Sequence, residues 1–141
     1  MSDKIEIDWN YLVFAWEDSS PDAAYYFDSE TGSVVLVQRD LDDIDELRDE
    51  IELHPNRYLY LPKPANNRLE LDLSDFVFTV SDQKLKAMLD VASEGSNKFS
   101  SCYKILTQYP GELARWEKWR EDAARERARK WLAAHNIQYL D

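Results

Sequence analysis

A long periodic segment near the C-terminus limits the folds open to this chain more than any other feature. From Glu112 to about His135, apolar residues recur at the three- and four-residue spacing of an amphipathic helix. At 1.5 Å per residue, such a helix is about 35 Å long. Pro110 and Gly111 separate it from the preceding chain. We expect it to be the longest element of the fold.

Short elements joined by definite turns are expected in the rest of the chain. Only 3 of the 141 residues are glycine, and no Gly/Ser/Pro linker or internal repeat occurs. Hydrophobic residues make up 44% of the sequence, so a chain of this length can bury roughly two thirds of its unfolded surface without a metal or a disulfide. The sequence therefore predicts a single domain over residues 1–141.

A small antiparallel sheet is predicted in the first half of the chain. Aromatic and β-branched runs at 25–27 and 34–37 flank a turn, which is typical of a hairpin. In that turn, Gly32 can take the positive φ that a side chain resists, and Asp28 can accept bonds from turn amides. Residues 58–62 form a third short strand.

Five or six helices are predicted around this sheet, which gives an α+β fold. Their N-caps and ends follow from Asp, Ser, Gly and Pro residues at the ends of apolar-periodic segments. The segment 71–80 has both strand propensity and helical spacing, and we assign it as helix. The expected helices are one from Trp9 with Asp8 as cap, one from Asp40 to about His54, the 71–80 segment, one from Ser81 or Asp82 to a break at 94–97, one after that break with Phe99, Tyr103 and Leu106, and the long C-terminal helix.

Charge is distributed unevenly along the chain. The net charge is -11, and residues 1–60 hold 16 acids and 4 bases, whereas residues 101–141 hold 6 acids and 8 bases. A field of this sign repels phosphate backbones unless the positive charge is gathered in one place, so general nucleic-acid binding is disfavoured. The dense acids from Asp40 to Glu52 form either a solubility surface or an imitation of a phosphate backbone for a basic partner.

Residues capable of catalysis or metal binding are few. His54 and His135 lie far apart in the sequence and at helix ends, and Cys102 falls on the buried side of its helix. No Asp-rich calcium loop or metal-ligand spacing occurs, so no cofactor is expected. One cysteine and no apolar leader predict a cytoplasmic protein without a membrane segment. An enzyme remains an alternative only if folding gathers carboxylates that are distant in the sequence or places a histidine in a pocket.

Two arginines, Arg120 and Arg127, fall inside the apolar stripe of the long helix. In one interpretation their stems pack on the core while their guanidinium groups meet acids elsewhere in the chain. In the other, packing holds them as an anion site, because a fixed guanidinium can grip a carboxylate or phosphate at two points. The sequence leaves both interpretations open.

Bases and aromatic residues mix in the C-terminal third. Lys98 and Lys104 lie beside Phe99 and Tyr103, and Trp119 precedes Arg120, a combination that can indicate nucleic-acid binding. The helix–turn–helix pattern over 85–106 allows the same interpretation. Acids interleave with the bases of the long helix, however, which favours an ordinary solvated surface. Nucleic-acid association therefore stays a secondary alternative.

Several segments together resemble the bacterial uncharacterised protein family 0158 over nearly the whole chain. The similar segments are Ile7 to Trp9, Ala24 to Asp28, Thr31 to Val35, Tyr58 to Pro62, Phe76 and Val77 through Asp82 and Leu85, Gly95 with Phe99, Tyr103 and Lys104, Tyr109-Pro110, and Trp116, Trp119 and Arg120 with 125–132. The sequence departs from the family pattern at Asn97 and Ser101, where a glycine and an arginine are usual. The resemblance implies a small bacterial cytosolic domain with no assigned activity.

We therefore expect a non-enzymatic protein-interaction or regulatory module with an unidentified protein partner. The resemblance carries over eight possible surface residues: Phe99, Tyr103, Lys104, Trp116, Trp119, Arg120, Arg127 and Trp131. Six of them are the candidate binding residues: Arg120, Arg127, Trp119, Lys104, Tyr103 and Phe99.

Overall fold

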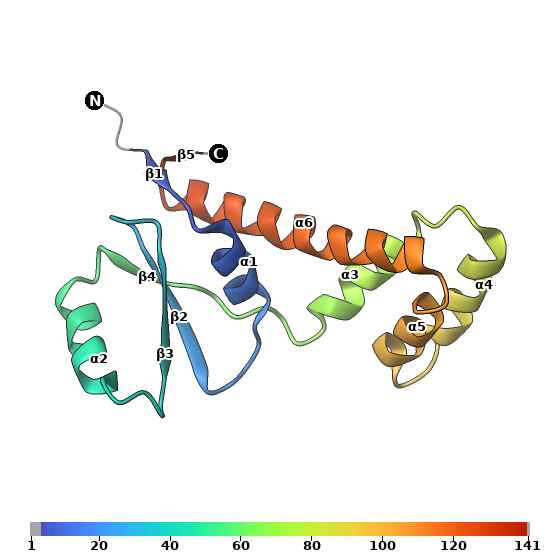
Figure 1. The fold of residues 1–141 in the computed structure, drawn as a ribbon, viewed down its shortest axis with the longest axis horizontal. Helices are drawn as coiled ribbons and strands as arrows, with labels where there is room; N and C mark the ends of the chain where they lie inside the picture. The colour runs from blue at the N-terminus through green and yellow to red at the C-terminus, as the bar shows by residue number, and fades with distance from the viewer. Residues whose placement is uncertain (1–3, 141) are drawn as a thin grey trace. The chain divides into compact units, whose positions relative to one another are not determined.

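The computed structural model describes residues 4–140 and confirms an α+β fold with a long C-terminal helix (Figure 1). The chain forms two compact units, a sheet unit of residues 1–64 and 124–141 and a helical unit of residues 65–123. The single domain over 1–141 stays a prediction. In order, the elements are β1 (Ile5–Glu6), α1 (Trp9–Glu17), β2 (Ala23–Asp28), β3 (Val34–Gln38), α2 (Ile44–Leu53), β4 (Tyr58–Tyr60), α3 (Arg68–Val77), α4 (Gln83–Ala92), α5 (Lys98–Leu106), α6 (Pro110–Ala134) and β5 (Tyr139–Leu140).

The three-stranded sheet confirms the predicted hairpin and third strand. Its order is β3-β2-β4, and both neighbours run antiparallel to β2. Tyr25 pairs with Leu36 on one face, and Tyr26 pairs with both Val35 and Tyr60 on the other. Because successive side chains alternate across a strand, these pairs define an inner and an outer face of the sheet.

The inner face of the sheet builds the core of the sheet unit. Tyr25 and Phe27 on β2 are buried, and they cluster with Leu12 of α1 and Leu132 of α6. Trp131 meets Phe27 edge-on, with ring centroids 6.0 Å apart. In Figure 1, α1 lies beside the C-terminal part of α6, which together cover this face. The apolar side chains that recur along α1 with a period of 3.6 residues therefore pack against the sheet and α6.

The outer face of the sheet is only partly covered. Helix α2 lies against β3, and Val37 of β3 and Ile51 of α2 are both buried. Tyr26 and Tyr60 lie farther along the same face with their ring centroids 5.5 Å apart, and Tyr60 remains 49% exposed. The outer face thus carries an aromatic pair of which one ring is exposed.

A buried carboxylate connects the hairpin turn to β4. Asp28 is only 5% exposed, and its two oxygens accept hydrogen bonds from Arg57 Nε at 3.0 Å and Nη2 at 2.9 Å. The same carboxylate accepts the amide of Glu30 at 2.9 Å, as the sequence predicted for this turn. Burial alone would raise the pKa of Asp28, but the bonds from Arg57 and Glu30 outweigh it and lower the pKa.

Gly32 allows the chain to pack on the hairpin turn. It has φ +81°, and a Cβ at this position would lie 2.1 Å from the carbonyl oxygen of Glu6. Asp8 donates its backbone N–H to the Gly32 carbonyl at 3.3 Å. The positive φ was predicted, whereas this close approach to the N-terminal segment was not, because nothing local signals it.

A two-stranded parallel pair joins the two ends of the sheet unit. Ile5 of β1 pairs with Tyr139 of β5, and Glu6 pairs with Leu140. Before β5, the chain leaves α6 through Asn136, which has φ 59°. Ile137 then donates its N–H to the carbonyl of Leu132 at 3.0 Å, which closes the helix end. The sequence analysis missed this pair because two-residue strands carry no periodicity.

The helical unit has a core of its own. Phe76 of α3, Leu85 and Leu89 of α4, and Leu106 of α5 are all inaccessible to solvent. They surround Trp116 of α6, whose ring centroid lies 5.4 Å from that of Phe76. Cys102 belongs to the same core, so its prediction as a buried residue is confirmed.

Two predicted helix boundaries were wrong. The helix assigned from Asp40 begins at Ile44 with Asp43 as N-cap, because the aspartates before it favour turns over helix interior. The helix assigned to 71–80 runs instead from Arg68 to Val77, so it both begins and ends three residues earlier than predicted. The predicted caps Asp8 and Asp82 are confirmed, since each carboxylate accepts the amide three residues ahead.

Replacing Gly32 by alanine should destabilise the sheet unit. A residue with a side chain is strained at φ +81°, and the added Cβ would also collide with the Glu6 backbone. Because the colliding atoms belong to the backbone, no side-chain rotation can relieve the collision. We expect Gly32→Ala to lower the free energy of unfolding by more than about 2 kcal/mol in urea denaturation followed by circular dichroism. Gly111→Ala is the matched control, because nothing lies within 4 Å of its Cβ position. It should stabilise by about 0.5 kcal/mol; equal effects of the two variants would contradict this account.

Neutralising Asp28 should also destabilise the sheet unit, and the loss should depend on pH. We expect Asp28→Asn to lower the free energy of unfolding by about 2 kcal/mol at neutral pH, because it leaves the guanidinium without its buried carboxylate. Since the folded state lowers the pKa of Asp28, its contribution is present above the unfolded value near 3.9 and lost as pH falls below it. The difference between variant and wild type should therefore shrink in melts below about pH 4.

Glu30 provides the control for this variant on the same guanidinium. Its carboxylate lies 3.3 Å from Arg57, but its side chain is 65% exposed. Glu30→Gln should change the free energy of unfolding by less than about 0.5 kcal/mol. A loss as large as that of Asp28→Asn would show that the exposed pair, rather than burial of Asp28, matters most.

Candidate functional site

Three of the six predicted binding residues share α5. Phe99 and Tyr103 lie one turn apart, and their rings stack with centroids 5.8 Å apart and planes 28° from parallel. Tyr103 and its neighbour Lys104 are exposed, whereas Phe99 is half-buried against the core of the helical unit. The structure therefore places two stacked aromatic rings and the exposed side chain of Lys104 together on this helix.

The tryptophans of α6 serve packing more than surface recognition. Trp119 is half-buried and meets Phe76 edge-on at 5.9 Å. Trp116, which the family resemblance carried over as a surface residue, is 1% exposed, so that expectation was wrong. Trp131 is half-buried between Phe27 and Trp16, with centroid distances of 6.0 Å and 5.8 Å. Aromatic residues in a long amphipathic helix are thus mostly core residues here.

Arg120 and Arg127 belong to different units. Arg120 lies in the helical unit and Arg127 in the sheet unit, and both are half-buried and engaged in side-chain interactions. Half-buried stems agree with their predicted place on the apolar stripe. The choice between a structural role and an anion site stays open for both residues.

The sequence analysis missed a pair of arginines that packs on Trp9. On α6, the guanidinium carbon of Arg125 lies 4.5 Å from the Trp9 ring centroid, and that of Arg129 lies 5.5 Å from it. Trp9 also meets Tyr139 of β5 edge-on at 5.5 Å. Cation–π contacts of this kind stabilise a partly buried indole, so these arginines hold α1 against α6 within the sheet unit. The i,i+4 spacing of Arg125 and Arg129 was visible, but their aromatic partner was not.

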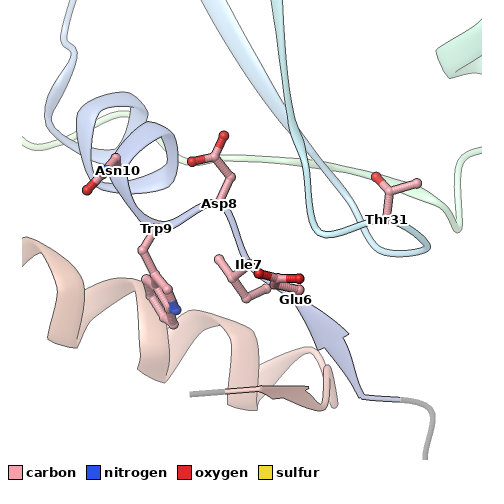
Figure 2. A pocket seen from close by; sticks show the side chains of 6 residues that line it. All are labelled: Glu6, Ile7, Asp8, Trp9, Asn10 and Thr31. Atoms are coloured by element: carbon pink, nitrogen blue, oxygen red, sulfur yellow. The ribbon is translucent and has the colours of Figure 1, made fainter.

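A shallow pocket of about 480 Å³ lies at the start of α1 (Figure 2). Its lining includes Glu6, Asp8 and Thr31, together with Ile7, Trp9 and Asn10. In Figure 2 the carboxylates of Glu6 and Asp8 point in different directions, and the Trp9 ring points toward α6. The carboxylate of Asp8 accepts the Tyr11 amide at 3.3 Å as a helix cap. These groups do not converge on one point, so the pocket lacks the geometry of an acid–base pair.

Neither histidine lines that pocket. His54 follows α2, and its Nε2 lies 3.6 Å from Glu50, with both side chains about half exposed. His135 follows α6, where its Nδ1 is 2.9 Å from the Trp131 carbonyl oxygen. Both imidazoles lie at helix ends, as predicted. Over residues 4–140, no three His, Cys, Asp or Glu side chains are grouped closely enough to hold a metal ion.

A polar cluster secures the turn between α1 and β2. Asp18 accepts hydrogen bonds from the Tyr25 hydroxyl at 2.5 Å and from the Ser20 hydroxyl at 2.5 Å. Lys63 donates to the backbone carbonyls of Ser20 and Ala23. The bond from Ser20 and then that from Tyr25 lower the pKa of Asp18, while burial and the Asp18 bond raise the pKa of Tyr25. A phenol held in its protonated form is no nucleophile, so this cluster is structural.

The carboxylate residues of the predicted acidic surface lie on the outside of the sheet unit. All eight carboxylate residues between Asp40 and Glu52 are exposed, and Arg48 is the one base among them. The tyrosine hydroxyl of Tyr58 on β4 donates to Glu50 at 3.5 Å, which links this segment to the outer face of the sheet. Tyr26 and Tyr60 lie on that face, but the sequence analysis did not name them as surface residues. Side chains alternate between the two faces along Ala24–Tyr26 and Tyr58–Tyr60, and this alternation would place both tyrosines on the outer face.

The described helices include none with the length and apolar character needed to cross a membrane.

No solved structure matches the chain. The profile of the uncharacterised protein family UPF0158 matches residues 4–141. The chain is also 30% identical over 133 residues to the UPF0158 protein PA5073 of Pseudomonas aeruginosa. The aligned residues make up 94% of this chain and 84% of that protein. The chain therefore belongs to the uncharacterised protein family UPF0158.

Proposed function

We propose that this chain is a non-enzymatic interaction module of the bacterial cytosol that binds a positively charged protein partner. The observation that carries the proposal is the acidic face of the sheet unit, defined as the eight exposed carboxylate residues between Asp40 and Glu52. No reaction step enters the proposal, because the titratable groups described above act as caps, clamps and surface charges.

The charge of the two units supports a positively charged partner. The sheet unit carries 18 acidic and 9 basic residues, whereas the helical unit carries 10 and 8. Clustered surface charge of one sign attracts an oppositely charged partner over long range and raises the rate of encounter. The acidic face is the densest such cluster in the sequence, so it is the part of the molecule that a basic partner would meet first.

Salt-dependent capture from a native lysate tests the proposed function. The wild-type chain should retain a partner at low ionic strength, and the affinity of the purified partner should fall several-fold on raising the salt to 0.15 M, where the Debye length is about 8 Å. The triple variant Glu46→Gln, Asp49→Asn and Glu50→Gln removes three charges of the acidic face and should weaken that affinity by about tenfold.

A matched variant separates local charge from total charge. Glu70→Gln, Asp75→Asn and Asp90→Asn remove the same number of exposed carboxylates from the helical unit. This control should bind the partner as the wild type does. Failure to capture any saturable partner, or equal weakening by both triple variants, would overturn the proposed function.

The stacked rings on α5 favour a second candidate, association with a single-stranded nucleic acid. Phe99 and Tyr103 offer an aromatic surface beside Lys104, and the nucleobases of a single strand stack on such surfaces. Two other basic residues of the helical unit already have polar partners: Lys98 donates to Ser74 at 2.7 Å, and Arg115 pairs with Glu112 at 2.8 Å.

Gel-shift titration with single-stranded RNA and DNA at low salt tests this candidate. If α5 binds bases, Tyr103→Ala should weaken the complex, since loss of one stacking ring removes about 1–3 kcal/mol of binding free energy. Phe14→Ala is the control, because Phe14 is an exposed ring of the other unit. No shift at low salt would dismiss nucleic-acid association.

A further inference from the structure

We infer that the outer face of the sheet, next to α2, docks a basic amphipathic segment of a partner protein, with aliphatic side chains on the aromatic patch and cations on the acidic face. The aromatic patch is defined as Tyr26, Val35 and Tyr60. This inference rests on the proposed function and names the surface and the chemistry of its partner.

The apolar part of this surface follows from the strand register. Tyr26 on the central strand pairs with Val35 on one neighbour and with Tyr60 on the other, so all three side chains emerge on one face. The two tyrosine rings meet edge to face, 67° apart, which fixes them relative to each other. Tyr26 and Val35 are half-buried, and Tyr60 is 49% exposed. A preformed aromatic patch loses little side-chain freedom on binding.

The charged part lies directly beside it. Helix α2 packs on β3, and Ile51 of α2 and Val37 of β3 are both buried. Tyr58, two residues before Tyr60 on the same strand face, donates its hydroxyl to Glu50 of α2 at 3.5 Å. Leu53, at the end of α2, is 73% exposed. The acidic face and the aromatic patch therefore form one continuous surface.

Charge complementarity decides which occupant fits. The eight exposed carboxylate residues beside the apolar patch repel an acidic segment and the phosphate backbone of a nucleic acid. A second copy of the chain would bring the same acidic face toward its own, which like-charge repulsion disfavours. A helical segment with lysine or arginine on one face and leucine or a similar residue on the other satisfies both parts of the surface, in the way that amphipathic helices dock in apolar grooves.

Binding of a labelled synthetic peptide of lysine and leucine, measured by fluorescence anisotropy at two salt concentrations, tests this inference with the full chain. Wild type should bind it saturably, whereas a lysine–serine peptide lacks the apolar contacts and a glutamate–leucine peptide has the wrong charge. Tyr60→Ser should raise the dissociation constant about tenfold with an unchanged salt dependence. The Glu46, Asp49 and Glu50 triple variant should raise it similarly and flatten the salt dependence.

Two controls and the possible outcomes make the test decisive. Phe14→Ser truncates an exposed ring of α1 in the same unit, and the helical-unit triple variant removes equal charge elsewhere; both should bind as wild type does. Equal binding of the lysine–serine peptide, or no effect of Tyr60→Ser in a folded variant, overturns the aromatic patch. If Tyr60→Ser fails to fold, the peptide comparison on the wild type decides instead: tighter binding of the lysine–leucine peptide than of the lysine–serine peptide supports the aromatic patch, and equal binding overturns it. A captured partner that is insensitive to Tyr60→Ser overturns this inference while the proposed function stands.

Discussion

Burial of the Asp28 carboxylate is the constraint on which the architecture of the sheet unit depends. A charge removed from water needs full compensation, and here two guanidinium bonds and turn amides provide it. Arg57 directly precedes β4, so satisfying Asp28 also positions that strand against β2. The side chain and the amide of Ser29 bond the carbonyl of Arg57 at 2.9 Å and 2.8 Å, which reinforces the same junction. The hairpin turn and the third strand therefore form as one assembly.

Local signals explain most of what the sequence predicted of the fold. Asp8 and Asp82 cap helices because a short carboxylate reaches the amide three residues ahead. Gly32 takes a positive φ because the hairpin turn requires it. What failed depends on partners distant in the sequence: the parallel pairing of β1 with β5 joins residues at opposite ends of the chain. No property of residues 5–6 taken alone could reveal that pairing.

The candidate site divides in the same way. Phe99 and Tyr103 were named as candidates on one predicted helix, and because one helical turn separates them, the structure stacks their rings. Trp116 was misjudged, since a family resemblance preserves core residues as well as surface residues, and only the packing around Phe76 shows which kind it is. The aromatic patch needed the strand register, because Tyr26 and Tyr60 are far apart in sequence and meet only through pairing of β2 with β4.

The discontinuity of the sheet unit has a consequence for how the polypeptide matures. Its first strand waits for a partner at residues 139–140, the last described segment to be synthesised. The helical unit, in contrast, is one uninterrupted stretch of 65–123. Closing a contact between distant chain positions is slow relative to local helix formation. During translation, the helical unit can thus assemble while the backbone of β1 still lacks its partner strand.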